Sequence, residues 1–87
     1  MKIIKDVVIR TVAGESMLIP VGETVREYNG IFTLTAVGAT IFEAIQNGQE
    51  PDALLQTVLN EYEIDEPTAK RDLDAFLDAL RGFGIIQ

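Results

Sequence analysis

The sequence predicts a small α+β domain in which a three-stranded antiparallel sheet is followed by three helices. The first observation behind this is a single change in the spacing of apolar residues, near residue 35, from short β-branched runs to a helical repeat. The second is length, since 87 residues can build one hydrophobic core and cannot be divided between two. We therefore expect residues 1–87 to form a single domain.

Three apolar runs in the first part of the chain predict strands at about residues 6–12, 16–21 and 29–34. A short link that contains glycine, Ala13-Gly14-Glu15, separates the first two runs and suits the turn of a β-hairpin. The runs are apolar at successive positions rather than at alternate ones. We therefore expect both faces of the sheet to be at least partly covered.

Three apolar stripes at helical spacing predict three helices in the rest of the chain. Thr35 is predicted to cap the first helix, and Gly48 to end it. Pro51 falls in the first turn of the second helix, where the missing N–H costs nothing. Asp65 is predicted to cap the third helix, and Gly82 to close it. The predicted order is therefore β-β-β-α-α-α.

The composition argues against catalysis by this chain alone. It contains no cysteine and no histidine, so disulfides, thiolate nucleophiles and the commonest general base and metal ligand are excluded. Four acids at helical spacing are interpreted as solvated helix surface rather than as a metal or acid–base site: Glu66, Asp72, Asp74 and Asp78. We predict a protein that is not an enzyme and has no catalytic residue, metal or cofactor.

Charge and hydropathy limit the partners. Residues 31–87 hold ten acids and three bases and carry the whole net charge of −7, because residues 1–30 sum to zero. Such a surface repels a duplex, so nucleic acid is not an expected partner. No apolar run approaches the roughly 18 residues of a membrane span, and no signal peptide is predicted. We expect a cytoplasmic protein with no membrane contact.

The segment Gly30–Phe42, with the sequence GIFTLTAVGATIF, resembles the "strand, Leu-Asn, x-x-Gly, helix" signature of PqqD-like proteins. These are the pyrroloquinoline quinone biosynthesis D proteins and the wider set of peptide recognition elements in ribosomal-peptide modification pathways. The apolar and acidic positions of 54–65 and 69–86 also resemble that family, so the similarity covers essentially the whole chain. One departure is Thr35, where the family often has Asn, and either residue caps a helix.

The resemblance implies a winged-helix-like fold and a peptide-binding adaptor that is not an enzyme. Such a domain binds the leader segment of a precursor peptide and presents it to a modifying enzyme, often a radical S-adenosylmethionine maturase. In the family, the leader adds as a strand to the third strand, in a cleft beside the third helix. Carried over to this chain, the expected peptide-binding residues are Ile31, Phe32, Thr33, Leu34, Lys70, Leu73, Asp74, Leu77 and Arg81.

The residues themselves fit this assignment and leave alternatives open. The third run is short and apolar, as expected of an edge strand that pairs with a peptide, and we expect Phe32 and Leu34 to point inward because Thr33 tolerates water. Leu73 and Leu77 either form the floor of the cleft or are plain core. Lys70 and Arg81 are candidates for contact with acidic leader residues. Two other functions stay open, a winged-helix DNA-binding or regulatory domain and a homodimerising structural module.

Overall fold

The computed structural model describes residues 2–4, 6–22 and 32–87. Its elements follow the predicted order, β-β-β-α-α-α, which confirms the α+β fold class. The start of the predicted third strand, residues 29–31, lies outside the described residues, and so does the predicted site residue Ile31. The elements are β1 (Val7–Val12), β2 (Glu15–Pro20), β3 (Phe32–Leu34), α1 (Ala36–Gln46), α2 (Pro51–Glu61) and α3 (Glu66–Gly82).

The strands form one antiparallel sheet in the order β1-β2-β3. A two-residue turn joins β1 to β2, in which Ala13 and Gly14 have φ values of 53° and 81°. Positive φ at both central residues is the geometry of a type I′ hairpin turn, and glycine adopts it without steric cost. The turn fixes the register, in which Val12 pairs with Glu15.

The predicted N-terminal caps of α1 and α3 are confirmed, whereas α3 runs through Gly82 to a C-cap at Phe83, and Gly84 is the glycine with positive φ after it. The Thr35 hydroxyl accepts a hydrogen bond from the Gly38 N–H at 3.0 Å. A carboxylate oxygen of Asp65 accepts one from the Thr68 N–H at 3.1 Å. Each bond satisfies a donor that has no partner inside its helix. Thr35 therefore also fixes the point at which the chain leaves β3 and enters α1.

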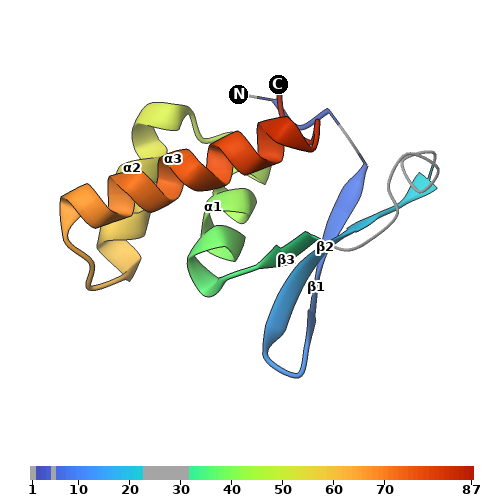
Figure 1. Cartoon of the computed structure of the whole chain (residues 1–87), viewed down its shortest axis with the longest axis horizontal. Helices are drawn as coiled ribbons and strands as arrows, with labels where there is room; N and C mark the ends of the chain where they lie inside the picture. The colour runs from blue at the N-terminus through green and yellow to red at the C-terminus, as the bar shows by residue number, and fades with distance from the viewer. Residues whose placement is uncertain (1, 5, 23–31) are drawn as a thin grey trace.

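The core lies between the three helices and one face of the sheet. Figure 1 shows the helices grouped together, with the β1–β2 hairpin extending away from them. Leu18 is the β2 residue that joins this core, with 1% of its surface exposed, whereas Val8, Met17 and Ile19 are only half-buried. The largest fully buried side chains of the helices are Ile41, Phe42, Leu54, Val58 and Leu80.

The two ends of the described chain meet. Ile3 forms an antiparallel bridge with Ile86, and the Ile4 N–H donates to the Ile85 carbonyl at 2.9 Å. Ile85 and Ile86 are 3% and 2% exposed, so this closing segment is part of the core. Figure 1 shows the N- and C-termini side by side at the end of α3. The bridge therefore holds the last turn of α3 in place.

Candidate functional site

The candidate site is the outer side of β3, which is an edge strand. The sheet order places β2 on one side of β3 and no strand of the described chain on the other. A strand in this position leaves a row of backbone N–H and C=O groups without a partner in the sheet. Such a row can pair with an added strand.

The hydrogen-bond pattern of the sheet shows which residue of β3 supplies those groups. The Val21 N–H donates to the Asp6 carbonyl at 2.9 Å, so these two residues are a hydrogen-bonded pair. Hydrogen-bonded and non-hydrogen-bonded pairs alternate along antiparallel strands. The β1–β2 register then makes Met17 a residue whose N–H and C=O point toward β1.

Because successive residues of a strand point their backbone groups to opposite sides, Ser16 and Leu18 direct theirs toward β3. Their partners in the register are Leu34 and Phe32, whereas Thr33 is opposite Met17 in a non-hydrogen-bonded pair. Thr33 therefore directs both its N–H and its C=O away from β2, to the free edge. Phe32 and Leu34 hold the strand in the sheet.

The side chains of β3 follow the expected alternation. Leu34 is 5% exposed and Phe32 is half-buried, while Thr33 is exposed. The Phe32 ring makes edge-to-face contacts with Phe76, at 6.2 Å between ring centroids, and with Phe83, at 5.1 Å. Such contacts stabilise a packed arrangement beyond the area that they bury. These three rings fix β3 against one flank of α3.

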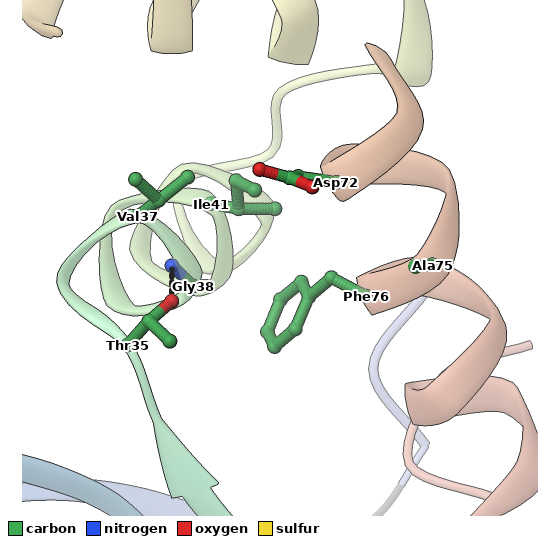
Figure 2. A pocket seen from close by; sticks show the side chains of 7 residues that line it. All are labelled: Thr35, Val37, Gly38, Ile41, Asp72, Ala75 and Phe76. Atoms are coloured by element: carbon green, nitrogen blue, oxygen red, sulfur yellow. Dashed lines mark hydrogen bonds between the residues drawn. The ribbon is translucent and has the colours of Figure 1, made fainter. Parts of the chain in front are cut away.

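A hollow of about 470 Å³ opens where β3 ends, between the first turn of α1 and the middle of α3. Figure 2 shows the Phe76 ring pointing across it toward Gly38 and Thr35, with Asp72 one turn away along α3. The absence of a side chain at Gly38 permits this approach. A Cβ atom there would lie 3.2 Å from a Phe76 ring carbon. The hollow is lined by Thr35, Val37, Gly38, Ile41, Asp72, Ala75 and Phe76.

The structure divides the predicted residues of α3 into two groups. Leu73 and Leu77 are 5% and 6% exposed, which makes them part of the core. The polar residues are exposed, and they pair within the helix: Lys70 with Asp74 at 3.5 Å, and Arg81 with Asp78 at 3.5 Å.

Helix geometry places those polar residues away from β3. At about 100° per residue, positions 70, 74 and 81 lie on one side of the stripe formed by Leu73 and Leu77. Phe76 lies on the other side, and it is Phe76 that contacts Phe32. The structure thus brings Phe76, Phe83 and Asp72 to β3 and the hollow, and the sequence analysis had not assigned them to the site. Their signal was weak, since a Phe at the margin of an apolar stripe resembles ordinary core.

Among the described residues, no three His, Cys, Asp or Glu side chains lie close enough together to hold a metal ion. The pKa of Asp65 is lowered from its ordinary value of 3.8, chiefly by hydrogen bonds from the Thr68 hydroxyl and backbone N–H. The lowered pKa results from the role of Asp65 as the cap of α3, and Asp65 is not one of the residues that line the hollow. Within the described chain, no helix is both long and apolar enough to cross a bilayer.

Comparison with known proteins gives one family and one solved structure. The model of the family "Coenzyme PQQ synthesis protein D (PqqD)" matches residues 15–86. The structure "TbiB1 in Complex with the TbiA(beta) Leader Peptide" is similar over 100% of this chain and 95% of that chain, with 31% sequence identity and a TM-score of 0.79. No curated protein matches this chain.

Proposed function

The chain belongs to the PqqD family, and on this premise we propose that it is an adaptor that binds the leader segment of a ribosomally made precursor peptide. TbiB1, to which this chain is similar over its whole length, holds a leader peptide in its solved structure. The family resemblance seen in the sequence supports a second part of the proposal. In this part, the chain presents the bound leader to a modifying enzyme of the radical S-adenosylmethionine type. We propose no catalytic role for the chain itself.

The observation that carries this proposal is the orientation of Thr33. It is the middle residue of an edge strand, and its N–H and C=O both point away from β2. A peptide in extended conformation can accept from that N–H and donate to that carbonyl, which adds a fourth strand to the sheet. Backbone pairing of this kind gives affinity without dependence on the peptide's sequence.

Selectivity would come from the side chains beside the edge. The half-buried Phe32 and Phe76 rings offer an apolar surface that a leader side chain can cover. Leu73 and Leu77 support that surface from the core. Lys70, Asp74 and Arg81 lie on the opposite flank of α3, and their contact with the leader remains a prediction.

The test is a titration of isotope-labelled protein with leader peptides, followed by backbone amide shifts. The first probes are the TbiA(β) leader and the leader of any short precursor peptide encoded beside the gene. We expect the largest shifts at Phe32–Leu34 and along the flank of α3 that carries Phe76. Shifts along Lys70, Asp74 and Arg81 would instead support the site expected from the sequence. Shifts that avoid both β3 and α3 would contradict the proposal.

A measurement of molecular mass over a range of protein concentrations, with and without the leader peptide, separates the adaptor from a homodimer that uses the same edge. A dimer would show a mass that increases with protein concentration and that a leader peptide does not reduce. An adaptor would show a peptide-dependent shift at Thr33 at every protein concentration.

A further inference from the structure

The hollow beside β3 combines apolar walls with one charged group. Val37 and Ile41 line it from α1, and Ala75 and Phe76 line it from α3. The Thr35 hydroxyl is already hydrogen-bonded to the Gly38 N–H at 3.0 Å. Of the seven residues that line the hollow, Asp72 is the one with a charge. A ligand group that fits must therefore satisfy a carboxylate among walls that are mostly apolar.

The carboxylate of Asp72 is open to a new partner. Its ion pair is with Arg71, at a long distance of 4.0 Å between Nε and Oδ1, and both side chains are more than half exposed. Exposed pairs of this kind contribute little to stability and exchange easily with other partners. The other two cations of α3 are paired with different acids, Lys70 with Asp74 and Arg81 with Asp78.

The hollow also lies within reach of a strand added to β3. Thr35, which lines it, directly follows Leu34, the last residue of β3. Phe76 lines the hollow and also contacts Phe32, so one ring is shared by the strand and the hollow. Side chains of an added strand point alternately to the two faces of the sheet. One of those on the core-side face can enter the hollow near the end of β3.

We propose that the hollow is a specificity subsite for a lysine or arginine side chain of the bound peptide, recognised at its charged end by Asp72. This inference rests on the proposed function, since it concerns one residue of the peptide that β3 binds. Lysine and arginine have an apolar stem below a charged end, which matches mostly apolar walls that include one carboxylate. An acidic side chain would be repelled by Asp72. A purely apolar one would fill the hollow but would remove water from the carboxylate without replacing it.

The test begins with a displayed library of peptides of random sequence, selected on the wild-type protein and on Asp72→Asn. We expect wild-type protein to enrich peptides with a lysine or arginine at one fixed position of an otherwise apolar, extended motif. Asp72→Asn is expected to keep the motif and lose the preference at that position. Asp78→Asn, on the same helix but outside the hollow, is the matched control and is expected to select as wild type does.

Synthetic versions of one selected peptide then measure the charge contribution directly. Replacing the basic residue by norleucine keeps the stem and removes the charge. We expect this change to weaken binding to wild-type protein by about two- to fivefold, less at high salt, and to leave binding to Asp72→Asn unchanged. Asp72→Lys is expected to reverse the preference, so that glutamate binds better than lysine at that position.

The outcomes separate the subsite from the adaptor function. Enriched peptides that bind through Thr33 but carry no basic residue at a fixed position would overturn the subsite and leave the adaptor function standing. The same conclusion follows if Asp72→Asn selects the same basic residue as wild type. If neither protein enriches any peptide, the proposed peptide-binding function fails, and the subsite with it.

Discussion

Replacing Thr33 by proline tests the proposed peptide edge at a single backbone donor. Proline removes the backbone N–H, which at Thr33 points away from β2. The β2–β3 pairing uses the backbone groups of Phe32 and Leu34, so it keeps its donors. The residue before a proline is restricted to extended conformations, and Phe32 is already in a strand. The substitution should therefore leave a folded protein with an impaired edge.

The expected loss of affinity follows from the number of bonds removed. One backbone hydrogen bond contributes about 0.5–1.5 kcal/mol net, and the proline ring also hinders the approach of an added strand. Because about 1.4 kcal/mol corresponds to a factor of ten, we expect Thr33→Pro to weaken leader binding about tenfold. Calorimetric titration or fluorescence anisotropy with a labelled leader peptide measures this directly.

Two controls make the result specific. Thr33→Ala removes the exposed side chain and keeps the N–H, so its affinity should stay within about twofold of wild type. Thr11→Pro makes the same substitution at the other edge of the sheet, where Thr11 is opposite Ser16 in a non-hydrogen-bonded pair. It should leave leader binding unchanged. Circular dichroism and melting curves establish that each variant is folded. A folded Thr33→Pro that binds as tightly as wild type would refute the assignment of the edge.

Four further predictions concern the cap, the hollow, the core and the charge. Asp65→Ala should lower the melting temperature at pH 7 by roughly 4–8 °C. Since the pKa of Asp65 in the folded protein lies below 3.8, the difference in melting temperature between wild type and variant should persist above pH 4 and shrink as pH falls through the lowered pKa. A difference in melting temperature that does not vary with pH would contradict a charged cap. Gly38→Ala should weaken leader binding, because the new Cβ would lie 3.2 Å from a Phe76 ring carbon and 3.3 Å from the Thr35 hydroxyl oxygen. The higher helix propensity of alanine offsets up to about 1 kcal/mol of the resulting strain. Unchanged binding would show that the peptide does not use the hollow. Leu77→Ala should cost about 2–5 kcal/mol of unfolding free energy in chemical denaturation, and a smaller cost with a large loss of binding would place Leu77 in the cleft instead. Duplex DNA of random sequence should bind no tighter than about 10⁻⁴ M at moderate salt, and micromolar binding with a steep salt dependence would favour the DNA-binding alternative.

Local patterns in the sequence were sufficient to predict the order of the elements and most of their ends. Thr35 and Asp65 form the predicted cap hydrogen bonds, and the turn at Gly14 lies between the first two strands. The inward orientation of Leu34 and Phe32 also followed from the pattern. Each of these features depends on neighbours within a few positions of the chain, which is why a single sequence contains them.

The side of α3 that faces β3 was decided only by tertiary structure. Its apolar stripe, with Leu73 and Leu77 at the centre, has Phe76 on one margin and Lys70 on the other. The sequence does not indicate which margin packs against the strand, because that depends on where α1 and the sheet place the helix. The structure brings Phe76 to Phe32, and Asp72 to the hollow with it.

The outward direction of the Thr33 backbone groups was also decided only by tertiary structure. Alternation along the sequence predicts which side chains of β3 point inward, and says nothing about which N–H groups meet β2. The direction of those N–H groups depends on which residue pairs of β1 and β2 are hydrogen-bonded and on the register between β2 and β3. The sequence by itself therefore determined the order of the elements and the N-terminal caps of α1 and α3, and its family resemblance pointed to the strand for which we propose peptide binding. The backbone donor at its edge and the hollow beside it were decided by tertiary structure, because both arise from contacts between segments far apart in the chain.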